Sequence, residues 1–325
     1  MGSVVCFGEA LIDFLAAEET PGAPRPFLRY AGGAPANVAV AVARLGTPAA
    51  FVGMLGKDMF GDFLLDSLEA AGVSTAYAVR TDAANTALAF VTLDARGERR
   101  FSFYRPPAAD LLFGSAHFRE ECFADASVFH ACSNSLTEAA IAETTFEGLR
   151  RAWAAGALVS FDLNLRTNLW SKGEDPRPRI WTALREADVV KLCGAELAFL
   201  AEPLGGEAAV LEELWRGRSQ WLLVTDGAAP LRHFSRGSRG TFPSFKVETV
   251  NTTAAGDAFV GGLLSSLLSG GVTSASLQAF LADPARVQAA LRFASACGAL
   301  AVTRHGAFEA MPARAEVETF LRERA

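Results

Sequence analysis

Residues 127–163 read SVFHACSNSLTEAAIAETTFEGLRRAWAAGALVSFDL, two short apolar runs separated by a longer alanine-rich one. The short runs, 127–131 and 157–163, predict buried strands, and the run between them, 137–155, predicts a helix. The alternation continues through 176–186, 188–192, 195–201 and 221–225. Repeated strand and helix units predict a parallel sheet with helices on both faces.

The chain on either side of this stretch extends the same pattern. Residues 37–45 could form an alternating strand, but their alanine content, the entry through Pro35 and the exit at Gly46 favour a helix. Other expected elements are strands at 4–8 and 49–55, a helix at 59–71, and edge strands at 231–234 and 241–247. Helices are expected from there to the end of the chain.

A small second sheet is expected near the N-terminal end. Residues 86–93 and 99–104 predict a hairpin joined by residues 94–97. Because two strands alone do not make a stable unit, we expect them to join residues 12–30 in a small sheet. That sheet would cover one edge of the body as a lid, inserted in a single domain that spans residues 1–325.

Composition limits the classes of function. The formal charge of −6 and the pI near 5.4 provide no electrostatic footprint for nucleic acid. The five scattered cysteines contain no C-x-x-C pair and fit reduced thiols in the cytoplasm, and the four histidines have no metal-ligand spacing. The N-terminus lacks a basic leader, and no apolar run is long enough to cross a membrane, so neither secretion nor membrane insertion is expected.

Residues 250–259, VNTTAAGDAF, carry the sharpest chemical signal. Ligands of such sheets bind beyond the carboxyl ends of the strands. Here small residues lead into an apolar helix that begins near Gly256, so its first amides would be open to an anion. Ala254, Ala255 and Gly256 keep side chains out of the way, as a transferring phosphoryl group requires.

Asp257 stands at the same helix start. Its carboxylate is ionised at neutral pH and could accept a proton from a hydroxyl group that attacks phosphorus. The alternative is that Asp257 only caps the helix, as aspartate near a helix start often does.

Two segments together resemble the signatures of the PfkB (ribokinase-like) carbohydrate kinase family. They are residues 32–46, GGAPANVAVAVARLG, and residues 251–257, NTTAAGD. The likeness runs over essentially the whole chain and is closest to the fructokinase branch. The other matching segments are 8–13, 103–110, 162–166, 225–227 and 306–312.

The resemblance implies a ribokinase-like three-layer α/β/α sandwich with a β-sheet lid, ATP as phosphoryl donor and Mg²⁺ bridging phosphates. By the same likeness, Asp257 is the catalytic base, and Ala254, Ala255 and Gly256 form an anion hole. The positions expected to bind sugar hydroxyls are Asp13, Gly32, Gly33 and Asn37. A helix cap is the alternative role for Asn37.

Arginines and a glutamate complete the candidate site. Arg105 and Arg166 each follow a predicted strand and offer forked donors to a polar substrate or to phosphate, with surface ion pairing as the alternative. Glu196 matches an acidic family position that organises water around Mg²⁺. An exposed helix glutamate is its alternative reading.

The nucleotide side is expected at three positions. Thr225 and Gly227 match a family turn beside the nucleotide, and Ser295 matches the lining of the adenine pocket.

The chain departs from the family pattern in four places. Asn251 stands where most members carry an Asp that helps to bind a monovalent cation, so dependence on K⁺ is open. Ala254 replaces a glycine, Cys193 replaces an asparagine, and Pro230 replaces the last glycine of the nucleotide turn.

The function expected from these residues is transfer of the γ-phosphoryl of ATP to a ketose, most simply fructose to fructose 6-phosphate. The alternatives with the same chemistry are 2-keto-3-deoxygluconate and a riboside such as aminoimidazole riboside. A non-catalytic sugar-binding protein would usually lack the base. A dinucleotide-dependent dehydrogenase would need G-x-G-x-x-G, which residues 8–13 lack. A homodimer through the lid is expected by analogy.

Overall fold

The computed structural model describes residues 2–17, 22, 24–93 and 99–324. Its main feature is a nine-stranded sheet in the order β13-β12-β11-β10-β9-β8-β1-β4-β5. Neighbouring strands are parallel except at one edge, where β12 and β13 run antiparallel. The strands are β1 (Ser3–Phe7), β4 (Ala49–Gly56), β5 (Ser74–Thr81), β8 (Ala126–Cys132), β9 (Leu158–Asp162), β10 (Val189–Cys193), β11 (Trp221–Asp226), β12 (Ala229–Ser235) and β13 (Ser238–Phe242).

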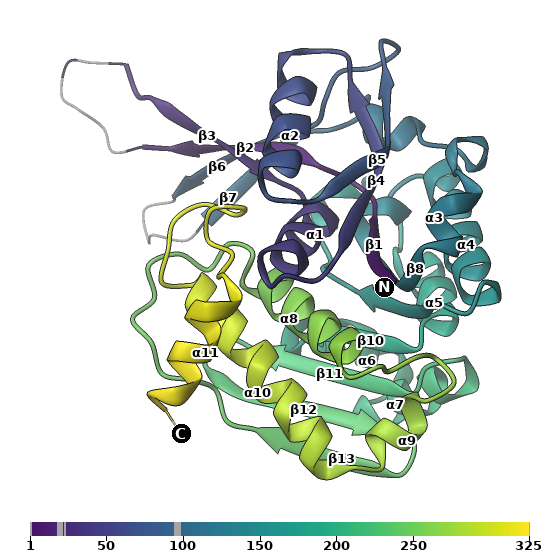
Figure 1. The fold of residues 1–325 in the computed structure, drawn as a ribbon. Coiled ribbons are helices and arrows are strands. Elements are labelled where there is room, and N and C mark those ends of the chain that lie inside the picture. The colour runs from purple at the N-terminus through teal and green to yellow at the C-terminus, as the bar shows by residue number, and fades with distance from the viewer. Residues whose placement is uncertain (1, 18–21, 23, 94–98, 325) are drawn as a thin grey trace.

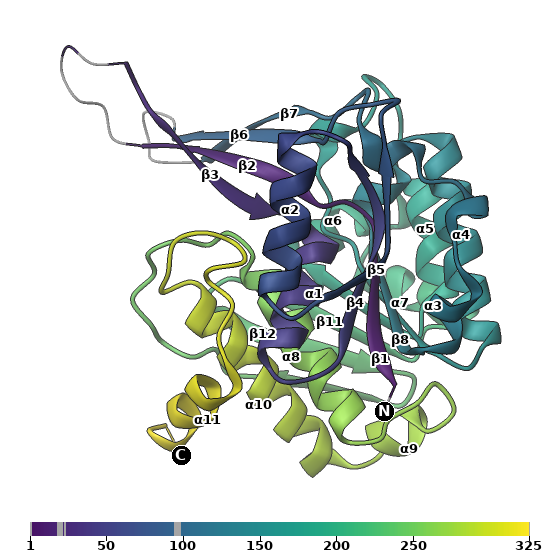
Figure 2. The ribbon, with the colours of Figure 1, turned by 45° about the horizontal axis from the view of Figure 1, so that its top comes forward.

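Helices cover both faces of this sheet (Figures 1 and 2). One layer holds α1 (Ala34–Arg44), α2 (Met59–Ala70), α8 (Ala255–Ser269), α9 (Leu277–Leu281) and α10 (Pro284–Ala301). The other holds α3 (Glu120–Ala124), α4 (Ala139–Ala154), α5 (Arg177–Glu186), α6 (Gly194–Ala201) and α7 (Glu207–Arg216). Helix α11 (Arg314–Arg322) packs beside α10. Short 3₁₀ helices occupy Ala109–Leu112, Ser115–His117, Ser133–Leu136, Thr167–Leu169 and Glu202–Leu204.

The central strands explain why the sheet is buried on both faces. Along β1, Val4 and Cys6 join the apolar core beneath α1, α8 and α10, while Val5 and Phe7 join the core beneath α4 and α5. Alternate side chains of a strand point to opposite faces, so a continuous apolar run supplies both cores. The prediction of a three-layer sandwich with a mainly parallel sheet is confirmed.

A separate four-stranded sheet, which we call the lid sheet, extends from the body (Figures 1 and 2). Its strands β2 (Leu11–Ala16), β3 (Phe27–Gly32), β6 (Leu88–Leu93) and β7 (Arg99–Tyr104) are ordered β3-β2-β6-β7. The expected hairpin is confirmed, since β6 and β7 pair antiparallel, but its turn at residues 94–97 and part of the 18–29 segment lie outside the described residues.

Some element predictions were wrong. The expected edge strand at 241–247 ends at Phe242, because Pro243 has no backbone N–H to continue the ladder. Strand β5 was not expected, since it is an edge strand whose residues are mostly half-exposed. The helix expected at 37–45 is α1, which begins at Ala34, so the alternating-strand alternative is wrong.

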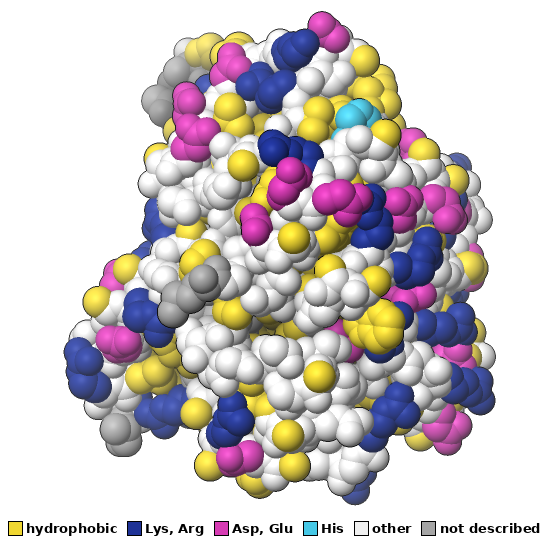
Figure 3. Space-filling model, turned by 45° about the vertical axis from the view of Figure 1, so that its right-hand side comes forward, with side chains coloured by type: hydrophobic (Ala, Val, Ile, Leu, Met, Phe, Trp, Pro, Cys, Tyr) yellow, Lys and Arg dark blue, Asp and Glu magenta, His cyan; other side chains and the backbone are white. Residues whose placement is uncertain are grey.

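The surface over α3, α4 and α5 carries both signs of charge. Figure 3 shows basic and acidic side chains interspersed on this face. Several of them pair, as in Arg151 with Glu120 and Arg185 with Glu213. Among the described residues, none of the helices combines the length and apolar character needed to cross a membrane.

Candidate active site

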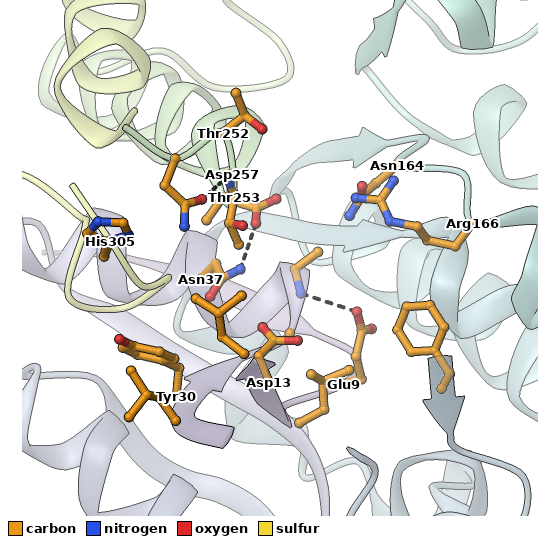
Figure 4. Close-up of a pocket in the computed structure, with 18 of the residues that line it drawn as sticks. Glu9, Asp13, Tyr30, Asn37, Asn164, Arg166, Thr252, Thr253, Asp257 and His305 are labelled. Carbon is orange, nitrogen blue, oxygen red and sulfur yellow. Dashed lines mark hydrogen bonds between the residues drawn. The ribbon is translucent and has the colours of Figure 1, made fainter. Parts of the chain in front are cut away.

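A cavity of about 840 Å³ lies between the lid sheet and the carboxyl edge of the main sheet. Loops that follow β1, β8 and β9 form one side of it, and the segment that leads into α8 forms another. Figure 4 shows Glu9 and Asp13 near the lid sheet, Asn164 and Arg166 together on one wall, and Asp257 beside Asn37. Its polar lining residues include Glu9, Asp13, Tyr30, Asn37, Asn134, Asn164, Arg166, Asn251, Thr252, Thr253, Asp257 and His305.

Asp257 is the third residue of α8 and borders this cavity while remaining 8% exposed. Its Oδ2 accepts a hydrogen bond from Asn37 Nδ2 at 2.7 Å. Burial raises the pKa of Asp257 to about 7; the Asn37 bond lowers it, the charge of Asp162 raises it, and Lys191 and Arg166 lower it. A carboxylate with such a pKa is suited to accept a proton near neutral pH.

The start of α8 is open, as the sequence predicts. Ala254 precedes the helix with φ 58° and ψ 10°, and no side chain caps the first amides. The first amides of a helix have no intrahelical acceptor and carry partial positive charge, so they favour an anion. Asp257 does not cap α8, since the capping position is Ala254, and Asn37 lies inside α1 rather than at its cap. Both capping alternatives are therefore wrong.

The expected sugar-binding glycines play different parts. Gly33 lines the cavity with φ 104°, and a Cβ there would lie 2.5 Å from the backbone oxygen of Glu9. Gly32 is not a lining residue; a Cβ on it would collide with Asp13 Oδ2, so glycine lets that carboxylate lie against the backbone. Asp13, Asn37 and Arg166 all line the cavity.

The structure does not bring Arg105 to the cavity. Its side chain is 2% exposed and donates to Asp110 Oδ2 from Nε at 2.8 Å and from Nη2 at 2.6 Å. Nη1 donates to the hydroxyl of Thr137 at 3.4 Å. The expectation that Arg105 faces a substrate is therefore corrected, because its donors are committed to an ion pair beneath the site. This pair is buried rather than a surface one.

The positions expected on the nucleotide side lie apart from this cavity. Thr225 is the penultimate residue of β11 and donates to the Leu192 carbonyl at 3.4 Å, and Gly227 turns the chain into β12 with φ 54°. Ser295 is partly exposed on α10. None of the three lines the cavity, so their nucleotide role stays a prediction.

Glu196 is 7% exposed, so the reading as an exposed helix glutamate is wrong. Its Oε1 accepts from the Leu165 amide at 2.7 Å and its Oε2 from the Cys193 amide at 2.6 Å. Both oxygens are engaged by the backbone, which fits contact with a metal ion only through water. Within the described part of the chain, no three His, Cys, Asp or Glu side chains are grouped as a metal ion would require.

Sequence reasoning missed several lining residues. Glu9 is 1% exposed, and its Oε1 accepts from the Ala34 amide at 3.2 Å and from Asn134 Nδ2 at 2.9 Å. It lies within a segment that carries the family likeness, so its place after the first strand could have revealed it. Nothing local marks Tyr30 or His305, which both line the cavity only in the folded chain.

A buried carboxylate beside an open helix start, at the carboxyl edge of a doubly wound sheet, is an arrangement suited to a phosphotransferase with an alcohol group as acceptor. A model of the pfkB family carbohydrate kinases matches residues 1–314. The chain belongs to this family.

Known fructokinases are similar to the chain over nearly its full length. It is 44% identical over 317 residues to fructokinase-1 of Oryza sativa subsp. japonica, which covers 97% of this chain and 96% of that relative. It is 57% identical to a fructokinase from Xylella fastidiosa with bound ATP, with a TM-score of 0.96 over 99% of this chain and 98% of that one. A fructokinase double mutant from Vibrio cholerae O395, in a fructose, ADP and potassium ion bound form, is 31% identical with a TM-score of 0.86, covering 99% and 98%.

Proposed function

We propose that this chain is an ATP-dependent kinase that phosphorylates the 6-hydroxyl of fructose. The observation that carries the proposal is the buried carboxylate of Asp257, which borders the cavity beside the open start of α8. The similarity to fructokinases at 44% and 57% identity supports fructose as the acceptor.

The residues of the chain divide the reaction between them. Ionised Asp257 accepts the proton of the acceptor hydroxyl as its oxygen bonds to phosphorus and the bond to the leaving ADP oxygen breaks. Asn37, which donates to Asp257 Oδ2, holds the carboxylate in orientation. The amides that follow Ala254 stabilise the negative charge on the phosphoryl group in transit.

The charges of the cavity favour a neutral sugar over 2-keto-3-deoxygluconate. Among the described residues, three carboxyl groups line it, those of Glu9, Asp13 and Asp257, together with the guanidinium of Arg166. Arg105, which could have balanced a sugar carboxylate, is committed to Asp110. An anionic acceptor would therefore meet more repulsion than attraction. A riboside is neutral as well, and it remains the alternative acceptor.

The proposed donor is ATP with Mg²⁺, held near Thr225, Gly227 and Ser295. Glu196 would contact Mg²⁺ through water, and the ion would neutralise phosphate charge. Dependence on K⁺ is open, because Asn251 stands at the cation-binding position and its Oδ1 already accepts from the Thr253 amide at 2.7 Å. Turnover with and without K⁺ measures it.

We further infer a single kinase domain with an inserted lid, lid closure over the sugar, and a cytoplasmic site of action. Free cysteines at all five positions are consistent with that compartment.

An acceptor panel tests the choice of sugar. With MgATP, fructose should give the highest kcat/KM, followed by a riboside, and 2-keto-3-deoxygluconate should give little turnover. Preference for the sugar acid would contradict the charge argument. Absence of turnover with every ketose would remove fructose as the substrate.

Asp257→Asn tests the base. The substitution keeps the shape and removes the proton acceptor, so we expect kcat to fall by about 10³-fold or more while fructose still binds. Calorimetric titration with fructose is the control for binding. Wild-type turnover in the variant would show that Asp257 is not the base.

A further inference from the structure

A buried lysine lies directly behind the anion hole. Lys191, on β10, is 8% exposed, and its Nζ donates to Asp162 Oδ2 at 3.0 Å. The two side chains form an ion pair that is 10% and 3% exposed. The proposed reaction assigns no role to this ammonium.

The ammonium is held against the start of α8. A Cβ added to Gly256 would lie 2.9 Å from Lys191 Nζ, and the next nearest atom would be Lys191 Cε at 3.8 Å. Gly256 therefore leaves room for a cation where the first amides of the helix point toward an anion. Any larger residue would push this charge away.

The negative charges around the start of α8 explain why a cation is needed there. Three carboxylates lie around Lys191, namely Asp162, Glu196 and Asp257. Burial by itself would lower the pKa of Lys191, but these carboxylates raise it above its ordinary value, so the lysine stays protonated. Without it, the ionised groups around the helix start would repel a phosphoryl group, with Arg166 as the remaining cation that acts on Asp257.

We propose that Lys191 is a positioning residue of phosphoryl transfer, whose ammonium, clamped by Asp162 against Gly256, adds fixed positive charge to the anion hole. The inference rests on the proposed function. The competing explanation is a structural ion pair that only stabilises the sheet, and the test separates the two.

The test compares Lys191→Met with the double variant Asp162→Asn/Lys191→Met. The single variant leaves Asp162 buried without its cation, whereas the double variant removes both charges and most of that folding penalty. Loss of one preorganised donor to transition-state charge typically costs about 10²- to 10³-fold. The Lys191 ammonium lies behind the amides and does not itself contact the phosphoryl group, so the effect should be smaller. We expect kcat to fall about 10- to 100-fold in both variants, with KM for fructose within about threefold of the wild-type value.

Recovery of wild-type kcat in the double variant would overturn the proposal, because a purely structural pair is dispensable as a whole. A rise in KM for fructose with unchanged kcat would overturn it as well. If the single variant fails to fold, the double variant alone decides, since it carries no unpaired buried charge.

A second readout does not depend on the sugar. The groups that act on Asp257 are Asn37, Asp162, Lys191 and Arg166. In the substrate-free protein, carbon-13 NMR of Asp257 should show its titration at higher pH in Lys191→Met than in the wild type. An unmoved titration would overturn the inference, whereas a wild-type protein that phosphorylates no fructose would overturn only the proposed function.

Discussion

Asp257 illustrates how a side chain acquires its chemistry from its surroundings. An exposed aspartate is ionised well below neutral pH and is a weak base. Here burial makes the charged form costly, and the hydrogen bond from Asn37 offsets only part of that cost. The result is a carboxylate whose proton affinity suits the working range of the cell.

The pH dependence of the reaction follows from this value. Because the proposed base, Asp257, can accept a proton only when ionised, kcat/KM for fructose should rise about tenfold per pH unit on the acid side and level off above about pH 7. The measurement is a pH–rate profile with MgATP saturating at each pH. A plateau that already extends down to pH 5 would contradict the raised pKa.

Ala254 occupies a backbone conformation that suits glycine. At φ 58° an L-residue costs roughly 1–2 kcal/mol, while glycine costs about 0.5–1 kcal/mol in the unfolded chain. We expect Ala254→Gly to raise the free energy of unfolding by about 0.5–1 kcal/mol, measured by urea denaturation. Ala255→Gly is the matched control, since Ala255 is helical and should lose stability. Equal effects of the two would refute the strain argument.

At this scale the sequence predicted what is local. Asp257 and Gly256 sit in one short segment, so motif and chemistry could be inferred together. Arg105 was misjudged because its burial depends on packing that no local pattern reports, although its partner Asp110 is only five residues away. Lys191 was missed for the same reason: only the fold places a residue of β10 behind α8.

Among the elements, the lid sheet shows a division between two faces. Asp13 and Leu15 of β2 line the cavity, as do Leu28 and Tyr30 of β3. The intervening Phe14 stacks on Phe90 at 5.0 Å between ring centroids, on the opposite face. The period of two thus gives one face to the cavity and the other to aromatic packing, part of which is against α2, where Phe14 meets Phe60 at 5.7 Å between ring centroids.

Closure of the lid sheet should be visible by hydrogen exchange. Saturating fructose should slow exchange in peptides from β2, β3 and β6 by about tenfold or more, because a covered sheet opens less often. The β12–β13 pair at the far edge of the main sheet is an internal control and should not change. Unchanged exchange in the lid strands would argue against closure.

The elements themselves were predictable where the signal is redundant. Strands buried on both faces and alanine-rich helices gave clear patterns from residue 127 onward. Strand β5 was not predicted because its residues are mostly half-exposed, as in many edge strands. The end of β13 was misplaced because Pro243 ends the strand although the residues around it favour β structure. The lid sheet was expected because its hairpin needed partners and because the family resemblance implies a lid.

At the scale of the whole molecule, the outer face of the lid sheet is a candidate contact between two copies of the chain. Phe27 and Tyr104 are 40% and 67% exposed, and both rings contact Phe90, so they share that face. Large exposed aromatic side chains gathered in one place are typical of association surfaces.

We therefore predict a dimer in solution that Tyr104→Asp weakens by at least about tenfold in dissociation constant, because a charge would be buried in the contact. Sedimentation velocity over a concentration series measures it. Leu204→Asp places a charge on another exposed apolar residue, 38% exposed beyond α6, and should leave the mass unchanged. A monomeric wild type would rule out the dimer.

The bond between Asn37 and Asp257 joins residues 220 positions apart, and α1 packs so tightly on α8 that a Cβ on Gly261 would collide with Ala41. A ribosome synthesises the chain from the N-terminus onward, so α1 is made long before α8. During synthesis the nascent protein therefore carries Asn37 long before it carries the proposed base, Asp257. Activity is therefore expected only after α8 has been synthesised and has packed on α1.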